Sequence, residues 1–216
     1  MSTRPIKLHY TLIMGLWDKH FYFAKIVKGL DGVNSNQLLG FRTEILEAIH
    51  KSNNIFVAGN GGSNAIASHF ATDLNKISHD KLIKFSTYGL GQNSSLSSAL
   101  ANDYGFEESI VTELSMLAKK NDLLIVISSS GTSKNILNSI KWAKENKVRS
   151  FALTGFVGSK ADELADNYLN LNLPVGDYGP AEDIHSIICH AIISYLNSDE
   201  FKLRYLNEQL DSRNLE

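Results

Sequence analysis

A stretch around residue 60 constrains the fold most, because it passes from a buried strand to a helix through a run of glycines. Residues 55–58 are all apolar and predict a strand, and three of the next four residues are glycine. Apolar residues then recur at helical spacing after Ser63, a residue type that often caps helix N-termini. Glycines allow close approach, and the helix N-terminus favours negative charge. The stretch therefore predicts an anion site.

A second polar loop follows the clearest buried strand, residues 122–127. Residues 128–133 carry five hydroxyls around one glycine and precede a helix to about residue 146. Hydroxyls and free N–H groups at a helix start can hold a phosphate without a lysine, so we expect a phosphate cradle rather than a plain capped turn. Neither glycine run matches the P-loop or the dinucleotide fingerprint, which argues against a nucleotide.

The order of the predicted elements favours a parallel sheet covered by helices on both faces. Further strands are predicted at residues 81–87, 149–153 and 168–173, and further helices at residues 8–29, 37–50, 96–101, 106–119, 159–165 and 184–196. We expect a five-stranded, doubly wound sheet. Its ligand should lie beyond the carboxyl ends of the strands, where both polar loops are placed.

Composition narrows the class of protein. The 216 residues are 43% hydrophobic and 20% charged, which is ordinary for a globular protein, and we expect one domain. Within it we expect a helical prefix at residues 1–52, an α/β core at 53–200 and a tail at 201–216. A net charge of −2 gives no basic footprint for nucleic acid or membrane. A single cysteine and no apolar signal core favour the cytoplasm.

Several titratable side chains could carry chemistry. His69 and Asp73 lie four residues apart, so a helix would place them on one face, where they could share a metal ion or a proton. Spacing alone equally fits a solvated helix face. The late helix carries similar side chains: Glu182, Asp183, His185 and His190. The alternative for these residues is that they are simply the polar side of an amphipathic helix. We expect Asn102 and Asp103 in a loop.

The segment from Gly59 to Ser63, with His69 six positions on, resembles the sugar isomerase (SIS) domain of sedoheptulose-7-phosphate isomerases, also called phosphoheptose isomerases. Other segments match in the same order: residues 102–107, the serine loop at 128–133, residues 153–155 and the stretch from Ile184 to His190. The resemblance covers nearly the whole chain. It implies a flavodoxin-like three-layer α/β/α sandwich and a homotetramer that uses the helical prefix, with active sites lined by more than one subunit.

The resemblance also implies an activity and a site. The activity is aldose–ketose isomerisation of a seven-carbon sugar phosphate, on the route to bacterial surface heptose of lipopolysaccharide or capsule, and zinc is found in the family. By position, sugar contacts would come from Asn60, Gly61, Gly62, Ser63, Asp73, Asn102, Asp103 and Glu182. Phosphate contacts would come from Ser128, Ser129, Ser130 and Ser133. Metal ligands would be His69, Asp73, Glu182 and His190.

The chain departs from the family pattern at two of these positions. Asp73 stands where glutamate is typical, and Glu182 where glutamine is typical; an arginine expected near residues 177–180 is also missing. On a straight helix Glu182 and His190 would lie ~12 Å apart along the axis. A shared metal would thus require Glu182 to precede the helix, or the ligands to come from different subunits.

The mechanism we expect moves one proton between C1 and C2 and another between their oxygens. Asp73 suits the first transfer and His190 the second. Two alternatives remain. One is a non-catalytic SIS module that binds a phosphosugar or a protein, like the bacterial factor that associates with the replication initiator. The other is an isomerase of a different phosphosugar, such as a hexose or an amino sugar.

Overall fold

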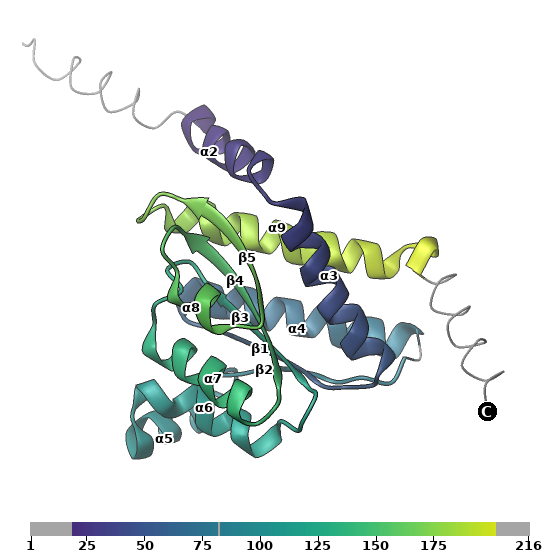
Figure 1. Ribbon diagram of the computed structural model, residues 1–216, viewed down its shortest axis with the longest axis vertical. Coiled ribbons are helices and arrows are strands. Elements are labelled where there is room, and N and C mark those ends of the chain that lie inside the picture. Colours follow the sequence, from purple (N-terminus) through teal and green to yellow (C-terminus); the bar gives the residue numbers. More distant parts are fainter. Residues whose placement is uncertain (1–18, 82, 202–216) are drawn as a thin grey trace, which may run out of the picture.

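The computed structural model describes residues 19–81 and 83–201, which form three layers with a five-stranded sheet in the middle (Figure 1). The strands are β1 (Ile55–Gly59), β2 (Thr87–Gly89), β3 (Leu123–Ser128), β4 (Arg149–Phe156) and β5 (Asn167–Leu173). They pair in the order β2-β1-β3-β4-β5, and every pairing is parallel. The expected doubly wound sheet is confirmed. Its strand order reverses between β1 and β3, the position where such sheets bind ligands.

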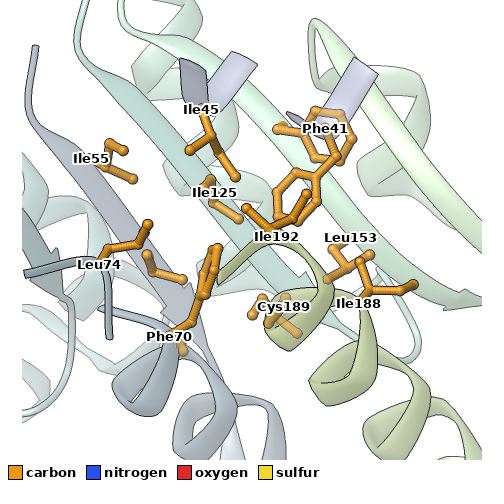
Figure 2. Packing of buried hydrophobic residues seen from close by; sticks show 14 of the residues in the cluster. Phe41, Ile45, Ile55, Phe70, Leu74, Ile125, Leu153, Ile188, Cys189 and Ile192 are labelled. Atoms are coloured by element: carbon orange, nitrogen blue, oxygen red, sulfur yellow. The ribbon is translucent and has the colours of Figure 1, made fainter. Parts of the chain in front are cut away.

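Helices cover both faces of the sheet. On one face lie α3 (Ser35–His50), α4 (Gly61–Lys81) and α9 (Tyr178–Asn197); on the other lie α6 (Phe106–Leu117), α7 (Lys134–Glu145) and α8 (Lys160–Leu164), with α5 (Ser94–Tyr104) packed on α6. Alternate strand residues serve the two faces, so Ile125 packs towards α4 and α9 (Figure 2) while Val126 packs towards α7. Both faces are apolar because both are buried, which explains the continuous apolar runs of β1 and β3.

The helical prefix packs on its own chain through α2 (Lys19–Asp31), which lies against α9 and β5. A side-chain carbon added at Gly29 would collide with Ile184, so the two helices approach closely there. Lys25 forms an ion pair with Asp177 at 2.6 Å. Three large apolar side chains of α2 are more than half exposed: Phe21, Phe23 and Val27. Residues 1–18 of the predicted prefix and residues 202–216 of the predicted tail lie outside the described part of the chain.

Three expectations about local structure were wrong. The second strand spans only Thr87–Gly89, and Lys81 belongs to α4. Ile83 and Phe85 are buried in the core instead, and the Ser78 hydroxyl donates to both of their carbonyls, at 2.6 and 2.8 Å. These alternating apolar residues are therefore buried in the core although their segment is not a strand.

The other two concern helix ends. Ser63 does not cap α4, since that helix already begins at Gly61, and the Ser63 side chain is buried in its first turn. Asn102 and Asp103 lie within α5 rather than in a loop, because that helix continues until Gly105, whose φ is 89°. Within residues 19–81 and 83–201, no helix has the length and apolar composition of a membrane span.

Candidate active site

The glycine loop, residues 59–63, and the serine loop, residues 128–133, leave the sheet side by side. Gly59 at the end of β1 pairs in register with Ile127, one residue before the end of β3. Gly61 has a φ of 54°, a conformation that glycine adopts without strain. A side-chain carbon added at Gly62 would meet the carboxylate of Glu182, which would have to move. The structure therefore brings Glu182, from α9, onto the glycine loop.

The serines of the serine loop fall into two groups. Ser128 and Ser129 are 6% and 4% exposed, and the Ser128 hydroxyl accepts a bond from the Gly131 N–H at 3.1 Å. Ser130 and Ser133 are partly exposed, and Ser133 is the N-cap residue of α7 without a side-chain capping bond. The Ser130 hydroxyl accepts from the N–H and the hydroxyl of Thr132, at 3.4 and 3.2 Å, so Ser130 and Ser133 both keep a hydroxyl proton for a phosphate at the start of α7.

A polar network under α8 supports the serine loop. Gly131 has a φ of 61°, and a side chain there would collide with Ser159; its carbonyl accepts from the Ala161 N–H at 2.9 Å. The Ser159 hydroxyl in turn donates to Asp162 at 2.8 Å. The same carboxylate accepts from Thr154 at 2.6 Å and from Asn170 at 2.5 Å. The conformation of the loop is therefore tied to β4 and β5.

The sequence analysis missed a side chain that joins the two loops. Asn135, in the first turn of α7, exchanges hydrogen bonds with Asn60 of the glycine loop: each Nδ2 donates to the other Oδ1, at 2.9 and 2.8 Å. Asn135 is 2% exposed, whereas Asn60 is partly exposed. A single sequence gives no sign that two asparagines 75 positions apart will pair.

Three of the four expected metal ligands come together where α4 packs on α9. His69, Asp73 and His190 can each offer a ligand atom within 4.8 Å of the others. Nε2 of His69 lies 3.3 Å from Oδ2 of Asp73, and the two histidine rings meet edge to face with centroids 5.0 Å apart. Two imidazoles and a carboxylate are the protein ligands of many catalytic zinc sites, which leave a position open.

Glu182 does not join this group within one chain. It lies inside α9, so its separation from His190 is ~12 Å along the axis, and its carboxylate lies on the glycine loop instead. Of the two arrangements expected to give a shared metal, the one with Glu182 before the helix is not found. α4 and α9 run in parallel, with Glu182 beside Gly62 at one level and His190 beside His69 further along.

The remaining candidates are less closely connected. Asn102 and Asp103 are exposed on α5, where the Asn102 amide donates to the Asp103 carboxylate at 2.9 Å.

His185 was expected on the polar side of the late helix but is fully buried. Burial lowers the pKa of His185 to about 4, because the charged ring would lose its hydration; the nearby backbone of Thr154 opposes this shift in part, although neither ring nitrogen has a hydrogen-bond partner among the described residues.

The chain matches the SIS domain model over residues 22–155. It is 34% identical to a phosphoheptose isomerase of Helicobacter pylori (strain Shi470) over 183 residues, which cover 84% of this chain and 94% of the relative. A second phosphoheptose isomerase, from Aliarcobacter butzleri, is also 34% identical, over 71% of this chain and 80% of its own. The chain belongs to the phosphoheptose isomerase family of SIS-domain proteins.

Solved structures agree with the family assignment. A phosphoheptose isomerase from Neisseria gonorrhoeae superposes with a TM-score of 0.72 at 26% identity, covering 81% of this chain and 94% of that one. One from Francisella tularensis gives a TM-score of 0.71 at 20% identity, covering 91% and 99%, and supports the fold. The candidate active site of this family member therefore has three parts: the glycine loop, the serine loop and the group of His69, Asp73 and His190.

Proposed function

We propose that this phosphoheptose isomerase family member converts sedoheptulose 7-phosphate to an aldoheptose 7-phosphate through an enediol, for bacterial surface heptose. The observation that carries the proposal is the convergence of His69, Asp73 and His190 on two packed helices. A scaffold that only binds a protein needs no such group. Relatives at 34% identity named phosphoheptose isomerase favour the heptose over other sugars.

The phosphate is proposed to bind at the start of α7. Ser130 and Ser133 present hydroxyls there, and the first N–H groups of the helix point the same way. Lys134 adds positive charge next to the loop, although it is paired with Glu107 at 2.8 Å. Bonds to a phosphate far from the reacting carbons fix the orientation of the sugar, which raises the rate of the chemical step.

Zinc fits the side chains present, because two imidazoles and a carboxylate offer ligand atoms that lie within 4.8 Å of one another. We propose His69, Asp73 and His190 as its ligands. When bound, the ion would supply a Lewis acid for the sugar carbonyl.

The protons are proposed to move through two of these side chains. In the direction from ketose to aldose, the Asp73 carboxylate takes a proton from C1 and returns it to C2. The His190 imidazole carries the second proton, from the oxygen on C1 to the oxygen on C2. The proton on carbon and the proton on oxygen are both conserved, so the reaction needs no oxidant or reductant.

We propose that subunits assemble as a homotetramer that shares these sites. His69 is 58% exposed on its side chain, and lies about 12 Å along α4 from Gly61, beyond the glycine and serine loops. Glu182 from a second subunit would then supply the fourth ligand that one chain does not bring to the group. Sedimentation at micromolar concentration should give a tetramer; a monomer would contradict the shared site.

Turnover is the direct test of the proposed function. Purified protein with added zinc should convert sedoheptulose 7-phosphate to an aldose, observed by NMR of the equilibrium mixture. Hexulose and pentulose phosphates assayed in parallel decide between this sugar and the other phosphosugars. No turnover of any of them, together with capture of a replication initiator protein, would favour the scaffold.

A further inference from the structure

We propose that Asn135 is a positioning residue for the isomerase reaction, which fixes the Asn60 amide and the glycine loop relative to the phosphate-binding serine loop. This inference rests on the proposed function for its kinetic test. It starts from the reciprocal pair of hydrogen bonds between the two amides, at 2.9 and 2.8 Å. The pair spans the point between β1 and β3 where the strand order reverses.

The hydrogen bonds already made by each amide give Asn135 and Asn60 different roles. Asn135 Oδ1 accepts from the Asn60 amide and from the N–H of Ile136, at 3.0 Å, which uses both of its acceptor positions. Asn135 is also 2% exposed, so its side chain is not accessible to a ligand. It can therefore act on the substrate only through Asn60.

Asn60 keeps one amide N–H and one acceptor position after pairing with Asn135. Its backbone carbonyl is occupied as well, by the N–H of Asn64 at 3.2 Å. Since Asn135 fixes which edge of the Asn60 amide is engaged, the remaining N–H has one direction. A hydroxyl or carbonyl oxygen of the sugar can accept from it.

The pair also fixes the distance between the glycine loop and the serine loop. The serine loop is anchored to β4 and α8, and α4 follows directly from the glycine loop. The pair adds a side-chain link between the glycine loop and the serine loop to the pairing of β1 with β3 behind them. Without this link, a bound sugar phosphate gripped at the phosphate would place its reacting carbons less accurately, and an error of about 1 Å can cost a hundredfold in rate.

Two variants of Asn135 test the inference. Asn135→Ala removes the pair, and Asn135→Asp keeps the size and the acceptor but removes the donor to Asn60. We expect kcat on sedoheptulose 7-phosphate to fall about ten- to a hundredfold in both. Competitive inhibition by inorganic phosphate should change less than about threefold for Asn135→Ala, because the hydroxyls at the start of α7 stay in place.

Asn138 provides the matched control. It lies on the same helix about one turn on, and its amide contacts Glu108 at the surface, at 2.7 Å. Asn138→Ala and Asn138→Asp should retain the parental kcat. If the Asn135 variants match them, or lose phosphate inhibition in proportion to kcat, Asn135 is not a positioning residue.

A double-mutant cycle separates this inference from the proposed function. Loss of either amide breaks the same pair, so urea unfolding should find Asn60→Ala with Asn135→Ala less destabilising than the sum of the single changes. Strict additivity would overturn the pair. A parent protein without turnover would contradict the proposed function, while non-additive unfolding would still support the link between the loops.

Discussion

His185 should make the protein sensitive to mild acid, and replacing it should remove much of that sensitivity. Its ring is fully buried in α9, and burial lowers its pKa from 6.5 to about 4. Between these two values the unfolded chain binds a proton that the native chain does not bind. The free energy of unfolding must therefore fall as the pH drops through this window, and it levels off below pH 4.

The size of the effect follows from the shift. Since one pKa unit corresponds to about 1.4 kcal/mol, His185 should cost the native state about 2 kcal/mol between pH 7 and pH 5, and about 3 kcal/mol by pH 4. Such a loss is a large part of the stability of an ordinary domain. Protonation of the ring is what makes this cost depend on pH.

Urea unfolding at pH 7, 6 and 5 measures this loss for the parent and for His185→Leu, which fills the site without a titrating group. EDTA in every sample excludes stabilisation by metal, whose binding is itself pH-dependent. His79→Gln, which removes an exposed histidine of α4, controls for the loss of an imidazole. The stability of the leucine variant relative to the parent should rise by about 2 kcal/mol from pH 7 to pH 5. A difference that does not change with pH would refute the reasoning.

Three further changes test the proposed site. Ser130→Ala should raise KM about ten- to a hundredfold, because a hydrogen bond to a charged phosphate is worth roughly 1.5–3 kcal/mol; a KM within error of the parent would place the phosphate elsewhere. Asp73→Asn should lower kcat by about 10²–10⁴, with the zinc content of the variant measured by mass spectrometry because lost metal would mimic lost chemistry; a metal-loaded variant at the parental rate would remove Asp73 from the mechanism. Gly131→Ala should lower the free energy of unfolding by more than about 1 kcal/mol, because its φ of 61° is strained for alanine and the added carbon meets Ser159; an unchanged urea midpoint would contradict this.

Continuous apolar runs made the sheet predictable from sequence. β1 and β3 are buried on both faces, so their residues leave little choice of structure. The predicted second strand failed because Ile83 and Phe85 are equally apolar but are buried in an irregular segment, held by the Ser78 hydroxyl. Such a side-chain bond has no signature in a local pattern. The predicted start of α4 at Ser63 and the predicted end of α5 before Asn102 were also misplaced. Glycine can both start and end a helix, and the sequence does not say which glycine does so.

The candidate site was predictable in part. His69 and Asp73 stand out by their four-residue spacing, but only the packing of α4 on α9 adds His190 to them. Asn135 and Asp162 escaped notice because each acts by bonding to residues that are distant in sequence or that look like ordinary loop residues. The burial of His185 was equally hidden, because an amphipathic pattern does not say which polar residue is enclosed.

The division of the site between loops and helix faces has a consequence for how the chain can diverge. The serine loop belongs to the strand ends, whereas His69, Asp73 and His190 belong to the pair of α4 and α9. Substitutions on that pair can alter the proposed reacting end of the site while the proposed phosphate-binding loop is inherited unchanged. Asp73 and Glu182, the two carboxylates at which the sequence was expected to depart from the family pattern, lie on these two helices. The helix pair is therefore where selection, or an engineer, would work to change the sugar without rebuilding the scaffold.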